Sequence, residues 1–186
     1  MSDDLPAEEF RWTEARMQLA LTANGALFDY IRYCAVPNID VIRCAVPHEC
    51  DLLILPVSRA HFIEVEIKTS ANDLVRDFKK RKHVVRENYD YQELYQSAIG
   101  SMWYAVPTEL VEKAVAVVHS RYGIVEVGRR WHERLQKWYT TTEIVRLPKP
   151  LKCHRPSDEQ VIAFLRRGVI RMWTGDERRL VEGYSG

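Results

Sequence analysis

Short apolar stretches separated by polar, proline-containing segments run through most of the 186-residue chain. Between residues 50 and 70, the sequence CDLLILPVSRAHFIEVEIKTS predicts two strands joined by a short turn. In the second strand, isoleucine and valine alternate with charged residues, and residues two apart on a strand share one face. The pattern therefore predicts one buried apolar face and an opposite face that carries Glu64, Glu66 and Lys68.

The rest of the chain shows both helical and strand periodicity. Apolar residues three and four apart indicate helices, whereas short apolar runs bounded by glycine or proline indicate strands. Three strands with short connections favour an antiparallel meander, and a strand after a helical crossover is expected to be parallel. The predicted elements are a helical region over 6–35 with a break or bend at Gly25, strands over 39–46, around Asp51 and around Glu66, a basic helix from Ser70, a strand over 101–106, a short helix from Thr108, strands over 114–119 and 124–127, a strand near 142–147, and a last helix from Ser157.

The last predicted helix has a capping signal and an amphipathic pattern. Ser157 is followed three residues later by Gln160, the spacing of a capping box. Because an exposed apolar stripe is unfavourable, this helix is expected to dock on the core. The stripe consists of Val161, Ile162, Leu165, Val169, Met172 and Trp173, and the opposite side carries Arg166, Arg167 and Arg171.

The length favours one domain, with or without an appended terminal helix. We expect a core over 1–130 and an extension over 131–186 that contains a strand, a linker and the last helix packed on the core. No apolar run is long enough to cross a bilayer and no signal peptide is evident, so a cytoplasmic protein is expected. The four cysteines and six histidines lack the spacing of a zinc site. The net charge of +1 does not by itself indicate a nucleic-acid-binding protein, but basic residues cluster at 76–86 and 166–171.

The first basic cluster belongs to the helix that follows the charged strand. Such a run is often a solvated helix face, but its position directly after a strand with acidic residues favours contacts with phosphates. The residues expected to contact DNA are Arg76, Lys79, Lys80 and Lys82.

Candidate chemistry begins with Asp51 at the head of the first hairpin strand and with Glu66 and Lys68 on the second. Taken by itself, the triplet Glu66-Ile67-Lys68 could be no more than an exposed Glu–Lys pair on a strand. The same acid-x-lysine spacing recurs in Asp77-Phe78-Lys79, which lies in a polar helix. Two convergent carboxylates repel unless a cation lies between them, and hard oxygen ligands select Mg2+ or Mn2+. The hairpin and the basic helix therefore favour a metal site.

A metal at this position would lower the pKa of a bound water, and an adjacent lysine would stabilise charge on a phosphoryl oxygen. These groups suit the hydrolysis of a phosphodiester. Glu64 points the same way, and it is a further ligand, a charge partner for Lys68 or a solvated side chain, with the last two favoured.

Asp51, then Glu66-Ile67-Lys68, with a helix before and after, resembles the PD-(D/E)xK nuclease superfamily, whose core has the order α-β-β-β-α-β. The stretches EVEIKTSANDLVRDFKK, MWYAVP and YGIVEV are similar to its MmcB-like DNA-repair branch, and Asp73, Asp77 and Lys79 fall on helix positions of that pattern. The resemblance covers roughly residues 39–127. The implied fold is α/β, with a restriction-endonuclease-like mixed β-sheet flanked by helices and an extra C-terminal helix.

The resemblance also implies a ligand set. Asp51, Glu66 and the Ile67 backbone carbonyl would bind Mg2+ or Mn2+, and Lys68 would assist the attacking water. Many members of the superfamily take a further ligand from the first helix. Glu14 is the best candidate here, and Glu8 and Glu9 compete with it.

The implied activity is that of a metal-dependent deoxyribonuclease in DNA repair or recombination, which leaves 5′-phosphate and 3′-hydroxyl ends. DNA is the expected partner, no membrane is expected, and a homodimer is left open. One alternative is a non-catalytic nucleic-acid-binding or adaptor protein that retains the fold. Another is an unrelated α/β domain, which carboxylates of Asp51 and Glu66 more than ~8–10 Å apart would indicate.

Overall fold

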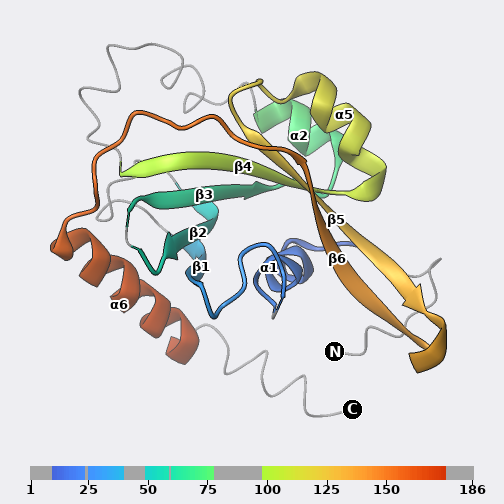
Figure 1. Cartoon of the computed structure of the whole chain (residues 1–186), viewed down its shortest axis with the longest axis horizontal. Helices are drawn as coiled ribbons and strands as arrows, with labels where there is room; N and C mark the ends of the chain where they lie inside the picture. Colours follow the sequence, from blue (N-terminus) through green and yellow to red (C-terminus); the bar gives the residue numbers. More distant parts are fainter. Residues whose placement is uncertain (1–9, 24, 40–48, 59, 78–97, 175–186) are drawn as a thin grey trace.

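A six-stranded mixed sheet with helices on both faces forms the centre of the molecule (Figure 1). The computed structural model describes residues 10–23, 25–39, 49–58, 60–77 and 98–174. The α/β class predicted from the sequence is confirmed. The elements are α1 (Glu14–Thr22), β1 (Tyr33–Ile39), β2 (Cys50–Pro56), β3 (Phe62–Ile67), α2 (Ala71–Asp77), β4 (Ile99–Pro107), the 3-10 helix η1 (Thr108–Leu110), α5 (Val111–Val117), β5 (Gly123–His132), the 3-10 helix η2 (Glu133–Leu135), β6 (Lys137–Arg146) and α6 (Asp158–Thr174).

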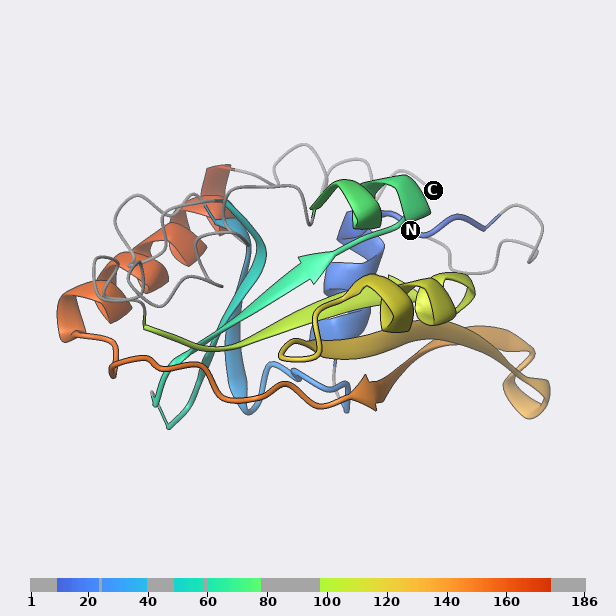
Figure 2. The ribbon, with the colours of Figure 1, turned by 90° about the horizontal axis from the view of Figure 1, so that it is seen from above.

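The six strands lie in the sheet in their sequence order. β1, β2 and β3 pair antiparallel, β3, β4 and β5 pair parallel, and β5 and β6 pair antiparallel. The antiparallel pair around Asp51 and Glu66 and the parallel strand after a crossover are both confirmed, whereas the first strand of the meander, β1, lies before most of its predicted range. Because parallel strands point the same way, β3, β4 and β5 end toward one edge of the sheet. α6 lies at the opposite end of the sheet from the β5–β6 hairpin (Figure 2).

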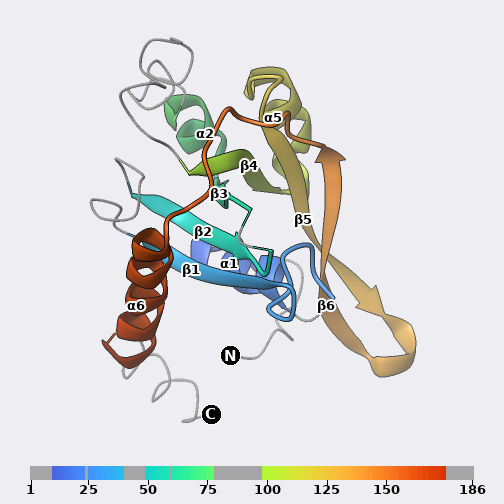
Figure 3. The ribbon, with the colours of Figure 1, turned by 60° about the vertical axis from the view of Figure 1, so that its left-hand side comes forward.

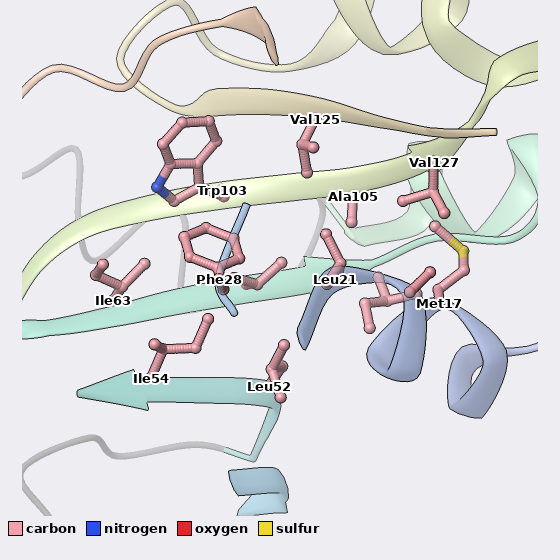
Figure 4. Close-up of a cluster of buried hydrophobic side chains, with 13 residues drawn as sticks. Met17, Leu21, Phe28, Leu52, Ile54, Ile63, Trp103, Ala105, Val125 and Val127 are labelled. Carbon is pink, nitrogen blue, oxygen red and sulfur yellow. The ribbon is translucent and has the colours of Figure 1, made fainter. Parts of the chain in front are cut away.

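One face of the sheet packs on α1 (Figure 4). Thr13 caps this helix, since its hydroxyl accepts a hydrogen bond from the Arg16 amide at 3.3 Å. Met17 and Leu21, four residues apart on the helix, are both fully buried against the strands. Ile63, Val65 and Ile67 of β3 point to this face, as the alternating pattern predicts.

The other face of the sheet is covered at two places. Phe164 of α6 packs on Phe62 at the start of β3, with ring centroids 5.2 Å apart. Beyond the end of β3, Leu74 of α2 and Ala114 of α5 pack on Tyr104 and its neighbours in β4 and β5. β3 is therefore buried on both faces, and its charged residues lie inside the molecule.

The predicted helical region over 6–35 is wrong beyond Thr22, where α1 ends. Gly25 follows with φ of +78°, a left-handed conformation that glycine adopts without strain. The Asp29 carboxylate then accepts a hydrogen bond from the Ile31 amide at 2.9 Å and closes a turn. The segment Tyr33–Ile39 forms the strand β1. Of the strand predicted over 39–46 only Ile39 is described, and residues 40–46, like residues 6–9, lie outside the described residues.

The strand predicted over 114–119 is also wrong, because Val111–Val117 forms the helix α5. The sequence AVAVVH is apolar at nearly every position, so it lacks the alternation that separates a strand from a buried helix. Burial follows helical spacing instead. Ala114 and Val118, four residues apart, are 0% and 4% exposed, whereas Val115 is 49% exposed.

The strands β5 and β6, which pair as a hairpin, are both longer than the strands predicted over 124–127 and near 142–147. β5 continues past Gly128, and β6 begins at Lys137 rather than near 142. A side-chain carbon on Gly128 would lie 3.0 Å from the hydroxyl oxygens of Thr108 and Thr141, which explains a glycine inside a strand. The predicted domain boundary after residue 130 falls within β5.

The capping box of α6 is confirmed. The Gln160 amide donates to Ser157 Oγ at 3.2 Å, and the Ser157 amide donates to Gln160 Oε1 at 2.9 Å. Docking on the core is also confirmed, but through a different set of side chains, because Phe164 was not part of the predicted stripe. Val161 and Phe164 are buried, whereas Ile162, Leu165 and Val169 are exposed. The side chains of Arg171, Met172 and Trp173 lie outside the described residues.

Within the part of the chain that the structure describes, no helix is both long and apolar enough to cross a bilayer.

We expect Phe164→Ala to lower the free energy of unfolding by about 3–5 kcal/mol, because it leaves a cavity against Phe62. Val169→Ala on the same helix removes a side chain that is 53% exposed and should change the free energy of unfolding by less than about 0.5 kcal/mol. Urea unfolding measures both values. Similar effects of the two substitutions would contradict the docking of α6 through Phe164.

Candidate active site

The register of β2 and β3 places Asp51 beside Glu66. Leu53 pairs with Glu64 and Leu52 with Val65, so the next residues along the two strands are Asp51 and Glu66. Residues directly opposite each other in an antiparallel pair have side chains on the same face. Both carboxylates therefore lie on the face that packs on α2 and α6.

A side chain continues the ladder of hydrogen bonds where β2 and β3 diverge. The Ile67 amide donates a hydrogen bond to Asp51 Oδ2 at 2.7 Å. The Asp51 carboxylate thus takes the place of the backbone carbonyl of β2 that would otherwise accept a hydrogen bond from this amide. This bond turns Asp51 toward the end of β3 and toward Lys68.

Lys68 joins the two predicted acidic residues. Its ammonium nitrogen lies 2.7 Å from Glu66 Oε2 and 3.1 Å from Asp51 Oδ2. The two carboxylate oxygens cannot be farther apart than the sum of these distances, so the wide separation expected for an unrelated domain is not observed. The Glu66 side chain is 1% exposed and that of Asp51 is 24% exposed, so solvent reaches the site from the Asp51 side.

Asp77, which repeats the acid-x-lysine spacing in a helix predicted to be polar, provides a third carboxylate. It is fully buried at the end of α2, and its Oδ1 lies 3.8 Å from the Lys68 nitrogen. Leu74 and Asp77 are three residues apart and both are buried, so they lie on one face of the helix. This spacing is the signal that could have placed Asp77 inside the molecule.

Tyr104 was missed by the sequence analysis. Its hydroxyl donates a hydrogen bond to Asp77 Oδ2 at 2.7 Å, and its side chain is fully buried in β4. Tyr104 pairs with Glu66 across the parallel strands β3 and β4. A single tyrosine within the apolar run SMWYAV was the available signal, because a buried phenol needs a hydrogen-bond partner.

The neighbouring carboxylates shift the pKa values of Lys68 and Tyr104 in the same direction. Burial alone would lower the pKa of Lys68, but the charges of Glu66, Asp51 and Asp77 outweigh this effect and raise it above its usual range. Burial, together with the charge of Asp77, raises the pKa of Tyr104. At neutral pH Lys68 is therefore a cation, and Tyr104 is a neutral hydrogen-bond donor.

Glu14 lies close to this group at the start of α1. The Gln18 side-chain nitrogen is 2.9 Å from Glu14 Oε1 and 2.8 Å from the Asp51 carbonyl oxygen, so one amide links α1 to β2. The side chain of Asn38 also contacts Gln18. The backbone of Asn38 is in the left-handed region, with φ of +46°. Partial desolvation and the charge of Asp51 raise the pKa of Glu14. The competing candidates Glu8 and Glu9 lie outside the described residues.

One of the three roles left open for Glu64 is excluded. Glu64 is fully buried, so the interpretation as a solvated side chain is wrong. Its charge contributes to the raised pKa of Tyr104, which places it in the same interior region.

Of the residues predicted to contact DNA, Arg76 is exposed on α2. The others, Lys79, Lys80 and Lys82, lie outside the described residues.

The described residues contain no set of three or more Asp, Glu, His or Cys side chains arranged as a complete metal site. The Lys68 ammonium lies between the nearest oxygens of Asp51 and Glu66 instead. Both carboxylates are hard oxygen ligands that meet at one point, so they suit Mg2+ or Mn2+ as the first members of a ligand set.

Comparisons with family models, with curated proteins and with solved structures find no match to this chain. Its function must therefore be inferred from the residues of the site themselves.

We expect Tyr104→Phe to lower the free energy of unfolding by about 1–3 kcal/mol, because it removes the hydroxyl that donates to the buried Asp77 carboxylate. Tyr139→Phe removes the same atom from a side chain that is 41% exposed and should have little effect. Urea unfolding at neutral pH compares the two variants. Equal stability of Tyr104→Phe and the wild type would contradict the structural importance of this bond.

The raised pKa of Glu14 predicts a pH-dependent effect on stability. Folding makes the proton on Glu14 harder to remove, so its negative charge at pH 7 opposes folding. In the presence of EDTA, Glu14→Gln should therefore be more stable than the wild type at about pH 7. The advantage should shrink as the pH falls through the raised pKa and vanish below the ordinary value of 4.5.

Urea unfolding at several pH values tests this expectation. The matched control is Glu112→Gln in the first turn of α5, where the side chain is exposed. A Glu14→Gln variant that is less stable than the wild type at neutral pH would contradict the sign of the effect.

Proposed function

We propose that the protein is a metal-dependent deoxyribonuclease that hydrolyses phosphodiester bonds in DNA repair or recombination. The observation that carries this proposal is the meeting of Asp51 and Glu66, from neighbouring strands, at the ammonium of Lys68. The element order through β4, with a helix before three strands and another after them, agrees with a restriction-endonuclease-like core. Both features are those of the PD-(D/E)xK superfamily.

Asp51, Glu66 and the Ile67 carbonyl would hold the metal in this proposal. The N–H and C=O groups of one strand residue point toward the same neighbouring strand. Since the Ile67 amide binds Asp51, its carbonyl belongs to the same side of β3. Glu14, linked to the Asp51 backbone through Gln18, would be the further ligand from the first helix. When bound, Mg2+ or Mn2+ would lower the pKa of a water ligand and offset charge on the phosphate.

Lys68 would act as a donor and not as a base. Its pKa is raised, so at neutral pH it keeps its proton and has no lone pair to accept one from water. It would instead donate hydrogen bonds to the attacking water or to a non-bridging phosphate oxygen, where negative charge increases in the transition state. The proton of the water would pass to a carboxylate or to solvent.

Asp77 and Tyr104 would position Lys68. Asp77 lies 3.8 Å from the ammonium, and its other oxygen accepts from the Tyr104 hydroxyl at 2.7 Å. Asp77 therefore offers Lys68 an anionic partner when Asp51 and Glu66 bind a metal. Loss of this partner would change the orientation of Lys68 without removing a metal ligand.

One observation favours the alternative of a non-catalytic nucleic-acid-binding or adaptor protein. The ammonium of Lys68 occupies the point where Asp51 and Glu66 converge, so the three side chains also form an ion-pair cluster that needs no metal to hold the carboxylates together. In that case the charged cluster would serve the fold alone. Cleavage and metal binding distinguish the two functions.

Cleavage of single-stranded, duplex and branched DNA with Mg2+ or Mn2+ tests the proposed activity. Glu66→Ala removes a proposed metal ligand and should abolish cleavage, and Lys68→Ala should slow it by about 10²–10³-fold, the usual effect of removing one transition-state donor. Glu112→Gln, on the exposed face of α5, should cleave like the wild type. Full activity of Lys68→Ala would show that the site is wrongly assigned.

Metal-dependent stability provides a second measurement on the same variants. A ligand that binds only the folded state raises the free energy of unfolding, by about 2.7 kcal/mol at 100 times its Kd. Mg2+ or Mn2+ should therefore raise the Tm of the wild type and of Lys68→Ala, but not that of Glu66→Ala. DNA binding without metal-dependent cleavage or metal-dependent stabilisation would favour the non-catalytic alternative.

A further inference from the structure

The β5–β6 hairpin extends beyond the strands that carry the site. β4 ends at Pro107, which pairs with Val127, but β5 continues to His132 and remains paired with β6 as far as Lys137. At ~3.3 Å per residue, the five residues after Val127 project by about 16 Å. Figures 1 and 3 show this projection. We call residues 128–142 the arm.

The arm leaves the sheet at the edge where the site lies. β3, β4 and β5 are parallel, and Asp51, Glu66 and Lys68 lie at or just beyond the carboxyl end of β3. The arm continues β5 in the same direction. A strand of DNA bound at Lys68 and running toward β5 would therefore meet the arm.

One face of the arm carries aromatic rings alternating with a guanidinium group. Trp131 and Trp138 are a cross-strand pair with ring centroids 5.5 Å apart. Arg129 lies 4.7 Å from the centre of the Trp138 ring and 3.7 Å from that of Phe10. Trp131, nearest the tip, remains 42% exposed. A ring of this size at the end of a projecting ribbon offers a flat surface for stacking.

The opposite face of the arm continues the face of the sheet on which Lys68 lies. Tyr139 is 41% exposed there, with the His132 ring 6.1 Å away. Arg130 is its cross-strand neighbour and pairs with Glu143. Both faces thus present an aromatic ring beside basic side chains.

The arm is also basic. Residues 128–142 contain four arginine or lysine residues and one acidic residue, whereas the whole chain has a net charge of only +1. Arg134 and Lys137 near the tip are exposed. A surface with this charge attracts a polyanion, and two copies of it would repel each other.

We propose that the arm binds an unpaired stretch of the DNA substrate next to the site of cleavage. Bases stack on Tyr139, on the face that continues from Lys68, and on Trp131, on the other face beside the tip, so the unpaired stretch passes around the end of the arm. Its phosphates pair with Arg134 and Lys137 near that tip. Basic side chains alone would be enough to bind the phosphates of a duplex, because its bases are already stacked on each other. Exposed rings beside cations match single strands, whose bases have free faces. This assignment rests on the proposed nuclease function, because it names the part of the substrate that the arm holds.

Fluorescence anisotropy with labelled oligo(dT) and with a duplex of equal length tests the arm, using the full chain in EDTA so that no cleavage occurs. Trp131→Ala should raise the Kd for oligo(dT) roughly tenfold, the typical effect of losing one stacking ring. Its effect on the duplex should be much smaller. Tyr30→Ala, which removes a 65% exposed ring outside the arm, should leave both Kd values unchanged.

Two further variants separate stacking from charge and from damage to the fold. Trp131→Phe retains a flat ring and should recover most of the affinity lost in Trp131→Ala. Arg134→Ala should reduce the slope of log Kd against log salt by about 0.7, as expected for one lost phosphate contact on a single strand.

Unchanged affinity of Trp131→Ala for oligo(dT), or an equal loss on the duplex, would overturn the assignment. A change in oligomeric state of this variant by sedimentation would also overturn it, since the arm would then join copies of the chain. Metal-dependent cleavage with normal oligo(dT) binding by Trp131→Ala would refute the arm alone. Weakened binding by Trp131→Ala in a protein that never cleaves DNA would refute the nuclease and retain the arm.

Discussion

The ion pairs of Lys68 are the interaction on which the arrangement of this protein depends. The ammonium and the carboxylates of Glu66 and Asp77 are buried, and burying a charge costs several kcal/mol unless its partners are well placed. The partners come from β2, β3 and α2, and Tyr104 adds a hydrogen bond from β4. The relative positions of four elements are therefore constrained at one point inside the molecule.

Burial on both faces of β3 gives this point its chemical character. One face packs on α1, and the other is covered near its start by α6 and beyond its end by α2 and α5. The charged side chains of β3 lie between the apolar residues that pack around α6 and those that pack around α2 and α5. The effective dielectric constant there is lower than in water. Solvent reaches the carboxylates from the side of Asp51, so the cluster is not sealed inside the fold, as the proposed binding of a metal and a phosphate would require.

The sequence was informative where a local pattern determines structure. Period-two alternation placed Glu66 and Lys68 on one strand face, and the short hairpin brought Asp51 beside them. The roles of Asp77 and Tyr104 could not be predicted in the same way, because their contact joins residues 27 positions apart through packing of α2 on β4. The apolar stretch AVAVVH was wrongly predicted to be a strand, because a uniformly apolar run has no period that distinguishes a strand from a buried helix. Its packing in the folded protein favours the helix.

The bond from the Ile67 amide to Asp51 links the site to the folding of the sheet itself. A slip of β2 by one residue against β3 would turn Asp51 to the face that packs on α1 and leave Lys68 without this partner. The same slip would move Leu52 out of the apolar core. A hairpin in the wrong register would therefore lose core packing and the ion pair together, so selection for the charged cluster would also be selection against misaligned β-sheets.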